Sequence, residues 1–124
     1  MLLAWSMVVS TIGLTVVAQL LVKWRVGSVA PPAGGAGDYA LWILRVFTDP
    51  YVVAAFLMAG TAAAAWFVAM TRLPLSLAYP FMALTFPMVV LGSWAFFDDT
   101  VSTLQIAGVA LIVGGVAFVG LGAR

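Results

Sequence analysis

Residues 11–23 read TIGLTVVAQLLVK, and polar side chains return in this stretch at every fourth position: Thr11, Thr15, Gln19 and Lys23. Positions four apart stay close to one side of an α-helix, so these side chains form a stripe along a single face. An amide or an ammonium buried in hydrocarbon without a partner costs on the order of several kcal/mol. We therefore expect the stripe to face other helices or a hydrated cavity rather than acyl chains.

The composition of the whole chain sets its class. Of its 124 residues, 65% are hydrophobic and 7% are charged, whereas a soluble domain carries about a quarter charged residues. A helical crossing of the hydrocarbon takes roughly 20 apolar residues, so this length allows about four crossings and no second domain. We predict one integral membrane domain over residues 1–124 with an all-α fold, a bundle of four transmembrane helices.

Several classes of function are excluded by what the sequence lacks. A net charge of +1 without a basic cluster gives no footprint for nucleic acid. The absence of cysteine and histidine excludes disulfides, thiol chemistry and the commonest metal sites. No nucleophile and base stand at a recognisable spacing, so we expect neither catalysis nor a bound cofactor or metal.

Four segments are long and apolar enough to be the crossings: about residues 2–23, 51–71, 75–97 and 101–122. Residues 26–38 are rich in Gly and Pro and predict a loop outside the membrane. Residues 39–47, with Trp42, Arg45 and aromatic ends, predict a short helix at the level of the headgroups. For the first segment a cleaved signal peptide is the alternative, but its apolar run is too long and its basic residues follow the run.

Short turns between successive crossings predict an up-and-down bundle with both chain ends on one side of the membrane. Asp98, Asp99 and Thr100 separate the last two crossings, where acidic and hydroxyl side chains are expected to cap the final helix. Lysine and arginine are nearly balanced between the two sides, with a weak bias that places the long loop in the cytoplasm. A near balance also fits insertion in both orientations.

Prolines and glycines mark the last two crossings. Pro80 and Pro87 each remove a backbone hydrogen bond, so they are expected to kink the third crossing and to make it a candidate hinge. Gly108 and Gly115 lie two turns apart on one face of the fourth crossing. Small residues allow close approach of helices, so this face is expected to pack within the bundle or against a second subunit.

Three motifs carry a resemblance to the small drug/metabolite transporters with four helices: residues 73–80 (LPLSLAYP), 99–102 (DTVS) and 108–116 (GVALIVGGV). Residues 18–23 (AQLLVK) carry a closer resemblance within that superfamily. Within that superfamily the chain resembles in particular the subunits of the aminoarabinose-phosphoundecaprenol flippase, whose first helix ends in a similar Ala-Gln-Leu-x-x-Lys pattern. The resemblance implies an antiparallel dimer, either of two copies or of this chain with a paralogue, in the bacterial cytoplasmic membrane. It also implies membrane lipids as partners and a polyprenyl-phosphate sugar as the substrate.

The related small multidrug resistance exporters share this fold and the glycine pattern of the fourth helix. They depend on a Glu in the first helix, eight residues before the Lys, and in this sequence that position is Thr15. Because no carboxylate lies within the apolar spans, exchange of a cation for protons by that mechanism is not expected here.

Five residues are the candidate substrate ligands: Thr15, Gln19, Lys23, Arg45 and Tyr79. The two basic side chains suit the lipid phosphate, while the hydroxyl and amide groups suit the sugar. Each residue also has a simpler role as an alternative. Threonine hydroxyls bond back to helix carbonyls, Lys23 and Arg45 anchor at the interface, and Tyr79 belongs to an aromatic belt.

Two other functions remain as alternatives to a flippase. An exporter of small drug or metabolite cations would use the same fold. A non-transporting membrane subunit of an envelope glycosylation complex would assemble with or regulate an enzyme.

Overall fold

The computed structural model describes residues 1–123, and the regular structure within them is helical. The helices are α1 (Leu2–Gly27), α2 (Ala36–Thr48), α3 (Pro50–Met70), α4 (Leu75–Met82), α5 (Thr85–Phe97) and α6 (Thr103–Gly122). Four spans are long and apolar enough to cross a membrane, namely α1, α3, α6 and the stretch Leu75–Phe97 that contains α4 and α5. The prediction of an all-α fold with four long apolar helices is confirmed.

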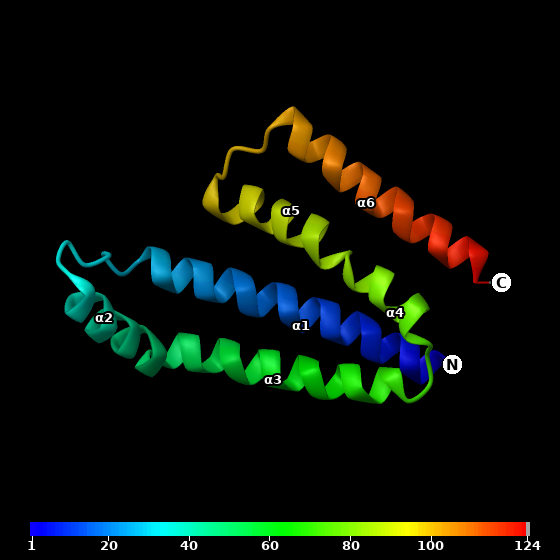
Figure 1. Ribbon diagram of the computed structural model, residues 1–124, viewed down its shortest axis with the longest axis horizontal. Coiled ribbons are helices and arrows are strands. Elements are labelled where there is room, and N and C mark those ends of the chain that lie inside the picture. The colour runs from blue at the N-terminus through cyan, green and yellow to red at the C-terminus, as the bar shows by residue number, and fades with distance from the viewer. Residues whose placement is uncertain (124) are drawn as a thin grey trace.

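The spans form a row in which α1 is central (Figure 1). Helix α3 runs antiparallel to α1 along most of its length, and α5 packs on another side of α1. Helix α6 lies at the edge of the row and packs mainly on α4 and α5. The start of α1 and the end of α6 lie at the same end of the bundle, and the connections that lead to α2 and from α5 to α6 lie at the opposite end.

Small side chains bring α1 and α3 close together. On α3, Ala55, Ala62 and Ala69 lie seven residues apart, and each is at most 2% exposed. Buried apolar residues of α1 recur at every fourth position: Ala4, Val8, Ile12 and Val16. Because lipid tails are as apolar as these side chains, close packing rather than escape from water holds the two helices together.

The end of the bundle that holds the chain ends has an apolar core. Its buried members are Ala4, Val8, Ile12, Val16, Ala69, Leu73 and Ala78. The rings of Trp5 and Phe81 meet edge to face there, with 4.8 Å between their centroids. Gly120 of α6 lies against the same Phe81 ring, which a Cβ at that position would approach to 3.2 Å. Packed apolar side chains therefore close this end of the molecule.

The third crossing is broken between α4 and α5. Pro87, in the first turn of α5, has no N–H to donate to the Ala83 carbonyl four residues earlier. That carbonyl accepts from the Phe86 N–H instead, at 3.1 Å. Pro80 lies inside α4, and the helix continues around it. Of the two prolines expected to kink this crossing, Pro87 is thus the one that accompanies the break.

The first connection is shorter than the sequence indicated. Helix α1 continues to Gly27, four residues past its predicted end, and α2 begins at Ala36 rather than at residue 39. The Gly- and Pro-rich signal interrupts the helices only over residues 28–35. Asp38 falls in the first turn of α2, where a negative charge favours the helix.

The cap of α6 also differs from the expectation. The residues expected to cap it, 98–100, do not do so. The Ser102 hydroxyl accepts from the Gln105 N–H at 3.2 Å, and the Gln105 side chain accepts from the Ser102 N–H at 2.8 Å. This reciprocal pair satisfies two amides at the helix start, so α6 begins at Thr103. Asp98 instead ends α5 in the left-handed conformation, with φ 52°.

Replacing Ala62 with leucine is expected to destabilise the contact between α1 and α3 by about 1–3 kcal/mol, because extra carbon atoms must enter a closely packed seam. Ala62 is 2% exposed, and its carbonyl oxygen lies 3.2 Å from the Thr11 hydroxyl. The melting temperature of the purified protein in detergent measures the effect. Ala64→Leu, on the exposed side of the same helix, is the control, and equal melting of the two variants would contradict this packing.

Candidate functional site

A groove of about 840 Å³ lies between the second half of α1, the first half of α3 and the end of α5. Three of the four stripe residues, Thr15, Gln19 and Lys23, line it. The other residues of its wall are mostly apolar: Ala18, Val22, Trp24, Val26, Gly27, Ser28, Ala55, Phe56, Ala59 and Phe97. A hollow of this size with a few polar groups on apolar walls is typical of sites for small organic ligands.

A second hollow of about 280 Å³ continues the groove toward the middle of the bundle. Thr15 and Ala59 border both hollows, and Thr11, Trp66 and Tyr79 line the second one. The tyrosine ring meets Trp66 edge to face, with 5.7 Å between centroids. From Thr11 to Lys23 the stripe extends roughly 18 Å along the helix axis, so the polar path covers more than half of a hydrocarbon core of about 30 Å.

Thr11 closes the inner end of this path. Its side chain is buried, and its hydroxyl lies 2.8 Å from the Met7 carbonyl oxygen and 3.2 Å from the Ala62 carbonyl oxygen. The single hydroxyl proton is thus shared between its own helix and α3. Thr11 therefore bonds back to its own helix, as threonine hydroxyls commonly do, and also joins α1 to α3.

Thr15 and Gln19 have unused hydrogen-bonding capacity. Within residues 1–123, the structure pairs neither the Thr15 hydroxyl nor the Gln19 amide with another group of the protein. Thr15 does not bond back to its own helix, which was the alternative for this residue. Both side chains line the groove, where they are available to a ligand that brings its own donors and acceptors.

Lys23 lies at the outer end of the stripe in a cluster of polar groups. Its ammonium donates to the Asp99 carboxylate and, at 2.8 Å, to the Ser93 hydroxyl. The Ser93 hydroxyl in turn donates to the Asp99 carboxylate. The ammonium also lies 4.9 Å from the centre of the Phe97 ring. Lys23 therefore ties the end of α1 to the end of α5, in addition to any role at the interface.

Sequence reasoning assigned Asp99 to a helix cap and missed this ion pair. Hydrogen bonds from Lys23 and Ser93 hold the pKa of Asp99 below its ordinary value of 3.8. The side chains of Lys23 and Asp99 are 44% and 43% exposed, so both remain accessible. The order of the crossings could have indicated this ion pair. The loops after the first and third crossings lie on the same side of the bundle, so charged residues near them can meet.

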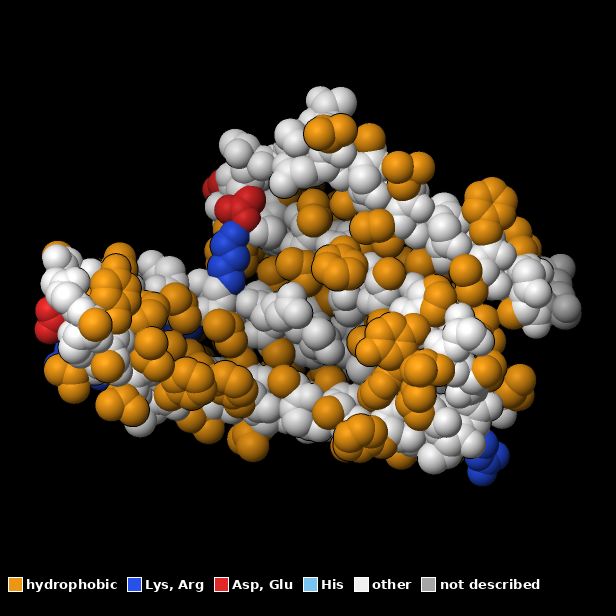
Figure 2. Space-filling model, in the orientation of Figure 1, with side chains coloured by type: hydrophobic (Ala, Val, Ile, Leu, Met, Phe, Trp, Pro, Cys, Tyr) orange, Lys and Arg blue, Asp and Glu red, His pale blue; other side chains and the backbone are white. Residues whose placement is uncertain are grey.

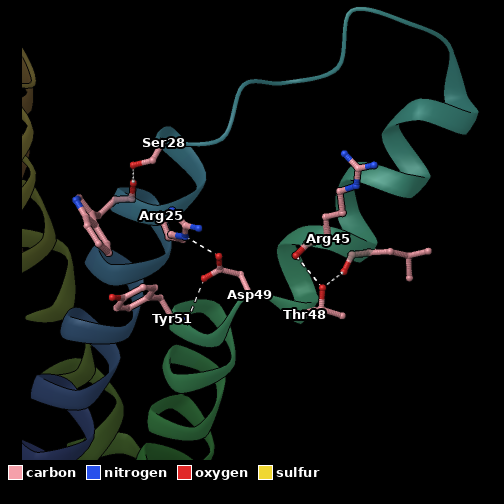
Figure 3. Close-up of polar contacts among 8 residues, drawn as sticks. Arg25, Ser28, Arg45, Thr48, Asp49 and Tyr51 are labelled. Atoms are coloured by element: carbon pink, nitrogen blue, oxygen red, sulfur yellow. Dashed lines mark hydrogen bonds and ion pairs between the residues drawn. The ribbon is translucent and has the colours of Figure 1, made fainter.

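A second ion pair joins α1 to the start of α3 (Figure 3). Arg25 donates from Nε to the Asp49 carboxylate at 2.6 Å, and the other Asp49 oxygen accepts from the Tyr51 N–H at 3.0 Å. Asp49 thereby caps α3 and pairs with Arg25 at once. Burial raises the pKa of Asp49, but the hydrogen bonds from Arg25 and the Tyr51 N–H outweigh it, and the pKa lies below 3.8.

Arg45 is not brought into the groove with the other candidate ligands. It lies on α2 and lines a separate pocket of about 160 Å³ together with Arg25 and Asp49. Figure 3 shows the Arg45 side chain extending from α2 toward the space under the loop. Val26 borders both this pocket and the groove, so the two hollows are neighbours.

Charged groups are sparse on the surface. On the face shown in Figure 2, apolar side chains are spread over the whole length, and most of the charged ones lie toward the end where α1 ends. The two ion pairs and Arg45 belong to that end. The groove therefore opens at the charged end of an otherwise apolar molecule.

No part of the described chain packs closely against Gly108 or Gly115. A Cβ built at either position would meet no atom within 4 Å. Within the spans, the close approaches of glycine lie at Gly92 against Leu20 and at Gly120 against Phe81. Packing inside the bundle thus does not explain Gly108 and Gly115, and their face is left to a partner or to lipid.

Comparison with known proteins gives a consistent group of relatives. The chain is 32% identical over 116 residues, 88% of its own length and 84% of the relative, to the "Probable 4-amino-4-deoxy-L-arabinose-phosphoundecaprenol flippase subunit ArnF" of Sodalis glossinidius. It is 33% identical over 76 residues to the corresponding probable subunit ArnE of Pseudomonas fluorescens, covering 61% of this chain and 67% of that one. For ArnE of Pseudomonas paraeruginosa the identity is 37% over 79 residues, with coverages of 64% and 68%. No protein-family model and no solved structure matches the chain.

The two ion pairs are expected to make stability depend on pH. Because the pKa values of Asp49 and Asp99 are lowered from 3.8, their stabilisation is present above that value and is lost as the pH falls through the lowered values. The melting temperature in detergent should therefore hold steady from about pH 7 to about pH 5 and fall below about pH 4.

Asp49→Asn isolates the charge in this experiment, since asparagine caps a helix as well as aspartate does. Its melting temperature should fall less steeply in acid than that of the unaltered protein. Asp38→Asn is the control, because the Asp38 carboxylate forms no ion pair within the described residues. Acid curves of the same steepness for both variants would contradict a role of Asp49 in acid sensitivity.

Proposed function

Because this chain belongs to the family of ArnE and ArnF subunits of the 4-amino-4-deoxy-L-arabinose-phosphoundecaprenol flippase, we propose that it moves an undecaprenyl-phosphate-linked sugar across the bacterial inner membrane. It acts as one multi-pass subunit of a transporter and carries out no covalent chemistry. The observation that carries the proposal is the groove, in which a polar stripe runs from Lys23 at the mouth toward the middle of the bundle.

The lipid phosphate binds first, at the mouth of the groove. Lys23 presents an ammonium there, at the depth where the phosphate of a membrane lipid lies, and charge-assisted hydrogen bonds of this kind are among the strongest in proteins. Asp99 holds that ammonium in the structure described. When the substrate enters, its phosphate takes the place of the Asp99 carboxylate as the partner of Lys23. The Lys23 ammonium is therefore never left unpaired.

The sugar then moves along the stripe. Gln19 and Thr15 lie deeper in the groove with free hydrogen-bonding groups, which suit sugar hydroxyls. Tyr79 lines the adjoining hollow and offers the next hydroxyl along the path. The long polyprenyl chain stays in the lipid beside the bundle, so only the polar head needs a protein-lined path.

Two elements outside the groove support this route. Helix α2 exposes several large apolar side chains, Tyr39, Leu41, Ile43, Leu44 and Phe47, and we place it at the level of the headgroups. Arg45 on this helix attracts anionic heads to the neighbourhood of the mouth. The break between α4 and α5, which lies just before Pro87, serves as the hinge of the third crossing.

A second subunit packs against the side of α6. This helix is the least buried of the four spans, and it exposes a stripe of large apolar residues two turns apart: Leu104, Leu111 and Phe118. Gly108 and Gly115 lie beside that stripe without a contact inside the chain. Small residues next to large ones are typical of seams between membrane helices, and we place the partner there, an antiparallel second copy or the paralogous subunit.

Lys23→Met and Gln19→Ala are expected to lower transport by about tenfold or more, because each removes a hydrogen bond to a charged or polar part of the head. The protein, with its partner subunit, is reconstituted in vesicles that contain the aminosugar lipid, and an amine reagent that does not cross membranes reports the leaflet of each head. Val17→Ala, on an exposed side of α1 away from the groove, is the control. Normal transport by both variants would show that Lys23 and Gln19 do not form the substrate site.

Gly115→Leu is expected to weaken assembly with the partner, because a large side chain blocks close approach of α6. Native mass spectrometry of the protein extracted with its lipids measures the fraction of dimer. Ala117→Leu, which places the same side chain on another exposed side of α6, should leave that fraction unchanged. A dimer fraction that is the same in both variants and the unaltered protein would show that this face does not form the contact.

A further inference from the structure

The cluster of Lys23, Ser93 and Asp99 separates two hollows. Lys23 lines the groove of about 840 Å³, and Asp99 does not. Ser93 and Asp99 instead line a hollow of about 300 Å³ on the side of α6, together with Thr100 and Gln105. The Lys23 ammonium and the Asp99 carboxylate therefore meet between the two hollows. Each of them faces a hollow that is large enough to receive part of a ligand.

The cluster is electrically balanced. Lys23 contributes one positive charge and Asp99 one negative charge, and the two are in direct contact. Arg25, the next basic residue along α1, is occupied by Asp49 on the side of α3. Both members of the pair are more than two-fifths exposed, so a ligand reaches them without unfolding of the bundle.

We propose, resting on the function proposed above, that this ion pair recognises a zwitterionic head: Lys23 binds its phosphate and Asp99 binds the ammonium of an amino sugar. The Ser93 hydroxyl, which bonds to both charged groups in the structure, remains beside Asp99. Asp99 is thereby the residue that determines specificity for an aminated sugar.

The chemistry of such a head matches the pair. When nitrogen replaces the hydroxyl at carbon 4 of arabinose, the ring closes through the oxygen at carbon 5, and the amine and the anomeric phosphate lie at opposite ends of a six-membered ring. The head thus carries a positive and a negative charge separated by one sugar ring. When the pair opens around the ring, each protein charge exchanges one partner for another of the same sign, and no charge is left alone.

A sugar phosphate without the amine lacks this match. Its phosphate draws Lys23 away from Asp99, and the carboxylate then loses its cation with nothing in exchange. Specificity of this kind comes from the contact between the Asp99 carboxylate and the ammonium, which the lipid without the amine cannot make. It discriminates between lipids that differ only in charge at one position of the sugar.

The test compares two lipids in vesicles that contain the protein and its partner subunit: the aminosugar lipid and its N-acetylated form, which has no charge on nitrogen. The unaltered protein should bind and move the amino form better by about tenfold. Asp99→Asn should lose this preference by weakening the amino form alone. Lys23→Met should weaken both lipids, since both carry the phosphate, and Asp98→Asn, the same change at the neighbouring residue, should keep the preference.

The outcomes separate the inference from the proposed function. If the unaltered protein moves neither lipid, the proposed function fails. If it moves both and Asp99→Asn keeps the preference, or weakens both lipids equally, Asp99 does not recognise the amine while the function stands. A second measurement needs no variant: the soluble aminosugar phosphate should raise the melting temperature of the unaltered protein more than its N-acetylated form does. Equal shifts would overturn the inference.

Discussion

A polar side chain inside a membrane must find a partner, and this requirement explains how α1 is placed among its neighbours. Both ends of its polar stripe are satisfied by the protein. Thr11 bonds to a carbonyl of α3, and Lys23 pairs with a carboxylate beyond α5. Between them, Thr15 and Gln19 have no partner within the described residues and face the groove. The bundle thus fixes the stripe at its ends and leaves its middle for a ligand.

The two ion pairs hold the end of α1 from different sides. Lys23 and Arg25 lie two residues apart, which turns their side chains roughly 200° around the helix. One therefore reaches the turn after α5, and the other reaches the start of α3. Exposed ion pairs contribute little stability individually, and a pair that is weak in water is readily opened by a competing anion. Such an arrangement suits a mouth that must bind a charged head and release it again.

Periodicity along one helix was readable from the sequence, and contacts between helices were not. The four-residue spacing predicted the stripe, and the apolar runs predicted the four spans, because both depend on neighbours along the chain. Asp99 was misassigned because the carboxylate meets Lys23 across 76 residues of sequence, whereas a capping role looked local. Arg45 was grouped with Lys23 because both are basic and both were expected near the headgroups, and the structure places it in the pocket with Arg25 instead.

The positions of the chain ends constrain how two copies can be linked. The start of α1 and the end of α6 lie at the closed, apolar end of the bundle, away from the groove mouth. A tandem fusion with a short soluble linker therefore holds two copies in parallel, since both junctions stay on one side of the membrane. An inverted pair needs one additional crossing in the linker. The kind of linker that a working tandem fusion requires therefore shows whether the two subunits are parallel or inverted.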